Sequence, residues 1–193
     1  MGSLEVVEYA SHVTLSTVCL FSALRMLEVH RGASAGFLLL AVASMSSVTS
    51  CFLYDQSLTS VRLSNLWVTS IIGLPLLVFA FFWTNGDHLT ANVILGSALL
   101  LASCSAHLSA QTKMAAIYLT NAGASLGMLM ISVFTGNAYG VLGSLALGTG
   151  GLLSFLNDGR ILPFSTDLVS DCVYGTSFLA LQMALRSQTC EVS

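Results

Sequence analysis

Long apolar stretches separated by short polar connections make up most of the chain. A helix that crosses a bilayer needs about 20 mostly apolar residues, because its backbone polar groups must be satisfied within the segment. Stretches of this kind run over 6–27, 33–54, 66–84, 89–109, 114–134, 138–156 and 164–185. The connections are too short to hold a further domain. The pattern therefore predicts an all-α membrane protein, a compact bundle of about seven transmembrane helices in a single domain over 1–193.

The composition also indicates a lipid environment. Hydrophobic residues make up 55% of the 193 residues and charged residues only 8%, whereas soluble domains carry about 25% charged residues. So few charges cannot cover a water-facing surface. With six Lys and Arg residues and a net charge of -3, the chain lacks the basic footprint of a nucleic-acid-binding protein. We expect membrane lipid as its surroundings, with a membrane-protein partner and no nucleic acid.

The cysteines form neither a metal-binding nor a disulfide pattern. They stand at Cys19, Cys51, Cys104, Cys172 and Cys190, with no C-x-x-C pair and an odd total. We therefore expect no metal ion and no cofactor. The last four residues, Cys-Glu-Val-Ser, have the form of a C-terminal prenylation signal. Glu191 is not aliphatic and no basic run precedes it, so Cys190 is retained only as a candidate lipidation site.

The stretch 138–156 is unusually rich in glycine. Glycine in a soluble helix costs about 0.8–1.0 kcal/mol relative to alanine, but in lipid it lets two helix backbones approach closely. At about 100° per residue, the small residues fall on two adjacent stripes and most leucines on the remaining third. The first stripe holds Gly140, Ser144, Gly148 and Gly151, and the second holds Gly143, Ala146, Gly150 and Ser154. We predict neighbours on two sides of this helix.

The stretch 114–134 offers a matching face. Gly123 and Gly127 form a G-x-x-x-G pair, a spacing by which transmembrane helices pack closely. We predict that this face meets the 138–156 helix. The same segment matches G-x-S-x-G around Ser125, but a nucleophile elbow needs a strand, a tight turn and a helix. Here the motif falls in the middle of an apolar helix, so we assign no catalytic residue.

Two acidic residues enter the last apolar stretch. Asp167 and Asp171 are four residues apart and share a helix face that Gln182 continues. An acid inside the membrane predicts a site that binds a cation or relays a proton. If instead the helix begins at Ser170, both acids lie in the headgroup region. With antiparallel successive helices, His12 reaches the depth of Asp171 and can pair with it, so the candidate polar site is Asp167, Asp171, His12 and Gln182.

The basic residues give only a partial topology signal. Arg25 and Arg31 follow the first stretch and nothing basic precedes it, which favours an N-terminus outside and a C-terminus in the cytosol. Over the whole chain the signal cancels, because Arg62, Lys113 and Arg160 fall on the opposite side from Arg25, Arg31 and Arg186.

Three functions remain open from the sequence. Sparse intramembrane charge and short connections favour a membrane component that acts without catalysis, as a partner or accessory protein through helix packing. The alternative is a small-solute or proton-coupled transporter, with Asp171 and His12 near its path. A second alternative is an intramembrane lipid-modifying enzyme, for which no complete acid–base or nucleophile set is visible.

Overall fold

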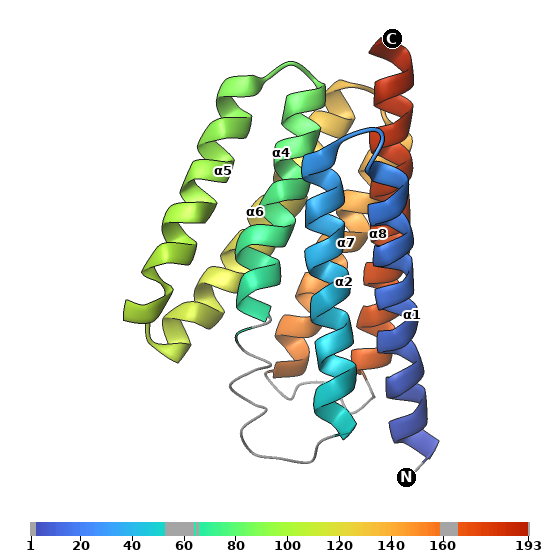
Figure 1. Cartoon of the computed structure of the whole chain (residues 1–193), viewed down its shortest axis with the longest axis vertical. Helices are drawn as coiled ribbons and strands as arrows, with labels where there is room; N and C mark the ends of the chain where they lie inside the picture. Colours follow the sequence, from blue (N-terminus) through green and yellow to red (C-terminus); the bar gives the residue numbers. More distant parts are fainter. Residues whose placement is uncertain (1–2, 53–63, 65, 159–165, 193) are drawn as a thin grey trace.

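The computed structural model describes residues 3–52, 64, 66–158 and 166–192, and these form helices and no strand (Figure 1). A π-helical segment, Thr69–Gly73, precedes α4, and a 3-10 turn, Cys104–His107, follows α5. The long helices are α1 Ser3–Met26, α2 Arg31–Phe52, α4 Leu74–Thr84, α5 His88–Ser103, α6 Ala110–Phe134, α7 Ala138–Asp158 and α8 Thr166–Val192. The predicted fold class, an all-α multi-pass membrane bundle, is confirmed.

Six of these helices form a closed ring. Going round it, α1 packs on α2, α2 on α4, α4 on α6, α6 on α7, α7 on α8, and α8 on α1. The ring encloses an apolar core that includes Phe37, Phe81, Met128, Leu147 and Leu181. Helix α5 lies outside the ring, where it packs on α4 and the π-helical segment (Figure 1). Among the described helices, α5 is therefore the one with neighbours on a single side.

The membrane spans differ in detail from the expected ones. Among the described residues, six helices are long and apolar enough to cross a membrane, and α1 is not among them. Helix α5 ends at Ser103 rather than near 109, and α8 continues to Val192 rather than ending near 185. The expectation of about seven spans is thus supported for six of them.

A proline shapes the start of α4. Pro75 has no N–H to donate to the preceding turn, which disrupts the regular α-helical pattern. The chain accommodates it with the π-helical turn directly before it, in which the N–H of Leu74 donates to the carbonyl of Thr69. Irregular turns of this kind are a known way for a helix to absorb a mid-helix defect. As a result, this span stays continuous, and 61% of it is buried between its neighbours.

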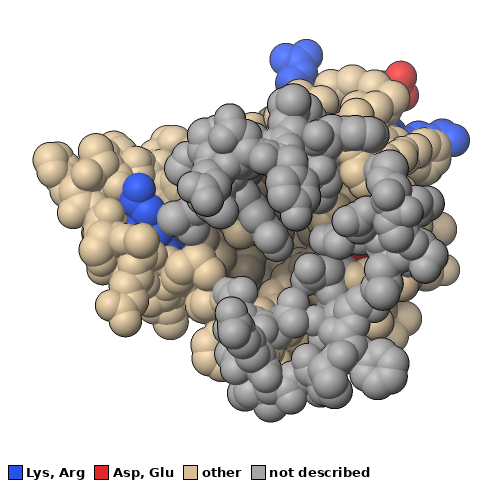
Figure 2. All heavy atoms as spheres, turned by 90° about the horizontal axis from the view of Figure 1, so that it is seen from below, with Lys and Arg blue, Asp and Glu red and all other residues tan. Residues whose placement is uncertain are grey.

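Among the described residues, the end of the bundle at which α1 begins exposes few charged side chains. Figure 2 shows this end, where uncharged atoms far outnumber the blue and red ones among the described residues. A surface so poor in charge fits a protein surrounded by lipid.

Candidate functional site

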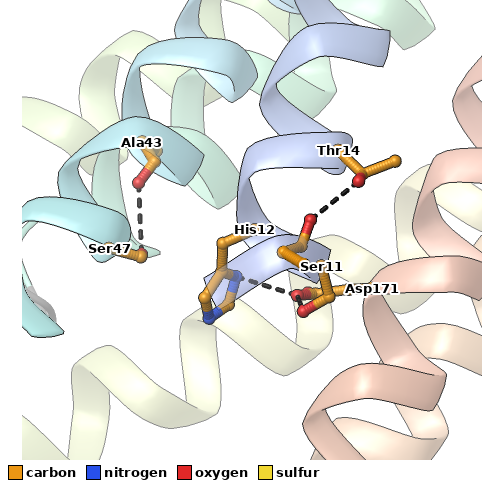
Figure 3. A network of polar contacts seen from close by, with 7 residues as sticks. Ser11, His12, Thr14, Ala43, Ser47 and Asp171 are labelled. Atoms are coloured by element: carbon orange, nitrogen blue, oxygen red, sulfur yellow. Dashed lines mark hydrogen bonds and ion pairs between the residues drawn. The ribbon is translucent and has the colours of Figure 1, made fainter. Parts of the chain in front are cut away.

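An ion pair between a half-buried histidine and a buried aspartate joins α1 to α8. The Nδ1 atom of His12 lies 2.8 Å from Oδ2 of Asp171. The hydroxyl of Ser11 donates a hydrogen bond to the same carboxylate oxygen at 2.7 Å. Figure 3 shows Ser11 and His12, neighbours on α1, both reaching toward Asp171 on α8. Only 8% of Asp171 is exposed, so the protein itself, rather than water, solvates this acid.

The start of α8 places Asp171 inside the helix rather than at its first residues. The helix begins at Thr166, before Ser170 and close to the predicted start at 164. Each helical residue rises about 1.5 Å, which places Asp171 about 8 Å beyond the helix start. Both α1 and α8 begin at the same end of the bundle (Figure 1). His12 and Asp171 therefore meet at similar depth, as the antiparallel arrangement of successive helices predicts.

An imidazole nitrogen of His12 and the hydroxyl of Ser11 meet on one carboxylate oxygen of Asp171. Asp171 is buried, whereas 17% of the His12 side chain is exposed. Loss of His12 would therefore leave a buried acid with one partner fewer. Ionisable groups inside a membrane bundle are typical of sites that bind a cation or relay a proton.

Polar contacts continue from this cluster onto α2. The hydroxyl of Tyr9 donates to the carbonyl of Val48 at 3.0 Å, linking α1 to α2. On α2, Ser47 donates to the carbonyl of Ala43 at 3.2 Å. In Figure 3, His12 lies between Ser47 on one side and Asp171 on the other. The polar half of α2 thus faces the same end of α1 that carries the ion pair.

The other predicted members of the polar site lie elsewhere. Gln182 is buried on α8, but it stands eleven residues after Asp171, which corresponds to about 16 Å along the helix. The structure therefore does not bring Gln182 into the cluster. The side chains of Asp167 and of the candidate lipidation residue Cys190 lie outside the described residues.

The glycine faces of α7 have the two neighbours that the stripes predict. Toward α6, a Cβ added to Gly140 would meet the side chain of Ser132, and one on Gly148 would lie 2.7 Å from Oγ of Ser125. A Cβ on Gly151, on the same face, would lie 3.8 Å from the Cβ of Asn121. Toward α8, a Cβ on Gly143 would lie 2.8 Å from Cγ of Leu181. The first stripe therefore faces α6 and the second faces α8.

Serine hydroxyls use this close approach. Ser125 of α6 donates to the carbonyl of Ser144 at 2.7 Å, and Ser177 of α8 donates to the carbonyl of Gly143 at 2.7 Å. Ser144 itself donates to the carbonyl of Gly140 within α7. Ser125, the serine of the G-x-S-x-G match, therefore serves helix packing. The sequence analysis did not predict these hydrogen bonds between helices. The spacing of Asn121, Ser125 and Ser132 does place the three residues on one face of α6, which was the available signal.

The predicted partner of the G-x-x-x-G pair is wrong. A Cβ on Gly127 would lie 3.5 Å from Val78 and 3.6 Å from Phe82, both on α4, and Gly123 has nothing within 4 Å. The reason is the rotation of α6, which turns its serine face toward α7 and turns Gly123 outward. Two glycines at the right spacing allow close approach but do not select the helix that approaches.

Taken together, a closed ring of apolar helices with a buried polar pair defines a multi-pass integral membrane protein. The comparison with known proteins places it more closely: the chain belongs to the transmembrane protein 276 family. It is 40% identical over 152 residues to transmembrane protein 276 of Bos taurus, covering 79% of this chain and 77% of that protein. The Homo sapiens and Mus musculus proteins are each 38% identical with the same coverage. No family model matches the chain, and no solved structure matches it.

Proposed function

We propose that the protein is a membrane component that acts without catalysis and binds another membrane protein through the outlying helix α5. The observation that carries this proposal is the position of α5 outside the ring. Only 11% of the span His88–His107 is buried, against 61% of the span Leu66–Thr84. A helix attached on one side keeps most of its surface available to a partner in the bilayer.

The outward face of α5 carries groups suited to a helix partner. Asn92 and Gly96 are both exposed and four residues apart, so they share a face. Nothing lies within 4 Å of the position that a Cβ on Gly96 would occupy. In lipid, an amide side chain gains by hydrogen bonding across helices, and a glycine lets a second backbone come close. These two residues favour a partner helix that has a small-residue face and a polar group opposite Asn92.

Affinity purification of the full chain in mild detergent tests this proposal. We expect Asn92→Leu with Gly96→Leu to lower the amount of co-purifying membrane protein severalfold, because the new side chains block close approach. Gly123→Leu on α6 is the matched control, since that glycine is also exposed with nothing within 4 Å. Equal recovery of every co-purifying protein with both variants would reject α5 as the binding helix.

A second candidate function, proton-coupled transport, is favoured by the ion pair of His12 and Asp171. Asp171 is buried and lies 2.8 Å from His12, and ionisable groups inside the membrane are typical of proton pathways. Asp171→Asn keeps the shape of the side chain and an oxygen for Ser11, but it cannot titrate. In vesicles that contain the protein and a trapped pH dye, we expect this variant to lose proton flux while the α5 partner still co-purifies.

The control for transport is Ser177→Ala, which removes a buried hydrogen bond of α8 to α7 and leaves the ion pair in place. It should keep the flux of the unmodified protein. Flux through Asp171→Asn equal to that of the unmodified protein, or no flux above protein-free vesicles with either, would reject proton-coupled transport.

A further inference from the structure

We propose that the connection between α1 and α2 is a pH-sensitive switch, in which His30 caps the start of α2 only while its imidazole is neutral. The connection lies at the end of the bundle opposite the N-terminus (Figure 1), and His30 is the residue directly before α2 begins at Arg31. The inference goes beyond both proposed functions, since it involves neither α5 nor the pair of His12 and Asp171.

The first observation is the hydrogen bond that the His30 side chain accepts. The backbone N–H of Ala33 donates to Nδ1 of the imidazole at 3.2 Å, and the N–H of Ser34 donates to the carbonyl of His30 at 3.0 Å. These are the two bonds of an N-cap residue, whose side chain accepts from the third helical residue while its carbonyl accepts the first bond of the helix. The imidazole therefore satisfies a donor that the helix itself leaves without a partner.

The second observation is that the surroundings hold the imidazole in this position. The half-buried ring packs edge-on against Phe79 of α4, with 6.0 Å between the ring centroids. A Cβ on Gly32 would lie 3.1 Å from Cε1 and 3.3 Å from Nδ1 of the same ring, so this glycine leaves the room that the imidazole occupies. The backbone is fixed as well, because the N–H of His30 donates to the carbonyl of Met26 at 2.8 Å. The ring is therefore held with Nδ1 toward the helix.

Protonation of His30 removes this cap. An imidazolium carries a proton on both ring nitrogens and can only donate, so Nδ1 could no longer accept from the N–H of Ala33. Its positive charge would also lie at the N-terminus of a helix, where the macrodipole disfavours a cation. The neutral imidazole with its proton on Nε2 is the form that fits the observed bond. The chemistry of the switch is therefore the gain or loss of one proton at Nδ1.

The charged groups near His30 are mostly basic. Arg31 follows it directly and Arg25 lies near the end of α1, and both are exposed. Glu28 is the one acid of the connection, and it is exposed too. On the other side, α4 packs against α2 and has no charged or titratable residue over Leu74–Thr84. A proton on His30 would therefore add a positive charge to a corner that already holds two.

The direction of the switch follows from the pKa of His30, which burial lowers from its ordinary value. The folded protein therefore binds this proton less tightly than the unfolded chain does. The contribution of the cap is complete above the unfolded value of about 6.5 and is lost as the pH falls through the lower folded value. The caps of α6 and α7 are Ser109 and Asn137, which do not titrate, and that of α5 is Asp87, which responds only to stronger acid. Among these four described helix starts, that of α2 is the one that responds where histidine changes charge.

Loss of the cap would loosen one corner of the bundle. Ser34 lies in the first turn of α2, and its hydroxyl donates to the carbonyl of Ala23 on α1 at 2.8 Å. Further along α2, a Cβ on Gly36 would lie 2.9 Å from the carbonyl oxygen of Gly73, so the helix is held closely against the π-helical segment from there on. Acid should therefore open the first turn of α2 and its bond to α1 while the rest of α2 stays in the ring.

Amide hydrogen exchange of the full chain in detergent micelles tests this inference, at about pH 7.5 and about pH 5.5, on either side of the ordinary value for histidine. After correction for the intrinsic effect of pH, we expect the protection of the amides of residues 33–35 to fall about fivefold at the lower pH, the range of a lost N-cap. The first turn of α7, capped by Asn137, is the internal control and should not change. Constant protection at the start of α2, or an equal fall at the start of α7, would overturn the inference.

Variants at two histidines separate the cap from other effects of acid. His30→Asn keeps a side-chain acceptor that does not titrate, so the protection of the first turn of α2 should be the same at both pH values. His30→Ala removes the acceptor, so the protection should be low at both. His88→Asn, at the start of α5, is the matched control and should keep the fall of the unmodified protein. A fall that persists in His30→Asn, full protection in His30→Ala, or a fall abolished by His88→Asn would each overturn the inference.

Discussion

Helices α7 and α5 are both apolar and both contain glycine, yet they are held in opposite ways. Around α7, a Cβ on Gly143 or Gly148 would lie less than 3 Å from a side chain of α8 or α6. Around α5, a Cβ on Gly96 would meet nothing within 4 Å. A glycine in an apolar helix therefore marks a close contact only where a second helix packs against it.

The serine hydroxyls around α7 and those on α5 differ in the same way. Close backbone approach lets Ser125 and Ser177 reach carbonyls of α7 from the neighbouring helices. On α5, Ser97 and Ser103 donate to carbonyls of their own helix, each at 2.8 Å. A hydroxyl therefore joins helices in one region and serves only its own helix in the other. The following variants test how much stability this difference carries.

The largest effect is expected at Gly143. A leucine there would place its Cβ 3.0 Å from the backbone nitrogen of Leu181, and backbone cannot rotate away. Overpacking of this kind costs about 3 kcal/mol, so Gly143→Leu should strongly lower the midpoint of thermal unfolding in detergent. Gly96→Leu is the paired control and should leave the midpoint unchanged or slightly raised. An equal fall in the unfolding midpoint of both variants would contradict the difference in packing between α7 and α5.

A smaller loss is expected at Gly148. Its new Cβ would lie 2.7 Å from Oγ of Ser125, which is the end of a side chain and can turn away. The cost is then the lost bond to the carbonyl of Ser144 plus local strain, together about 2 kcal/mol. Gly148→Leu should therefore unfold between Gly143→Leu and the unmodified protein in the same detergent assay. An unchanged unfolding midpoint would contradict close packing of α7 on α6.

Removing one hydroxyl should have a still smaller effect. Ser177→Ala deletes the bond from α8 to the carbonyl of Gly143, and such bonds contribute about 0.6 kcal/mol on average in membrane proteins. Ser97→Ala on α5 deletes a bond within one helix and should be neutral. Denaturation of both variants side by side measures the difference. If Ser97→Ala destabilises as much as Ser177→Ala, a hydrogen bond between helices contributes no more stability here than one within a helix.

The smallest effect is a pH dependence confined to the start of α5. The side chain of Asp87 accepts a hydrogen bond from the N–H of Thr90 at 3.1 Å. Hydrogen bonds with the side chain and the backbone of Thr90 lower the pKa of Asp87. A depressed pKa means that the folded state binds the proton less tightly. The capping contribution is therefore complete above the unfolded value of about 3.9 and is lost as pH falls through the folded value.

The start of α7 supplies the comparison, because its cap does not titrate. The N–H of Gly140 donates to Oδ1 of Asn137 at 3.1 Å. Amide hydrogen exchange on acidification should therefore rise in the first turn of α5 beyond the intrinsic change, and not in that of α7. Asp87→Asn should abolish the difference while keeping a cap. Acid-induced opening of both helices together would show that the caps are not responsible.

Several features of the site could be predicted because they depend on helix geometry alone. Residues four apart share a face, so the two stripes of α7 and their two neighbours follow from the sequence. The meeting of His12 and Asp171 also follows, since alternating helix directions bring the two helix starts to one end. The rotation of α6 could not be predicted, because Gly123 and Gly127 on one face and Ser125 on another are equally able to pack.

The sequence by itself determined that this protein is a bundle of apolar helices, since hydropathy and helix period are properties of single segments. It also determined which residues of α7 can approach a neighbour. Only the tertiary structure decided that α8 is the second neighbour of α7 and that α5 lies outside the ring. Each of these is a choice among faces of similar composition, and such a choice is made by how whole helices fit together.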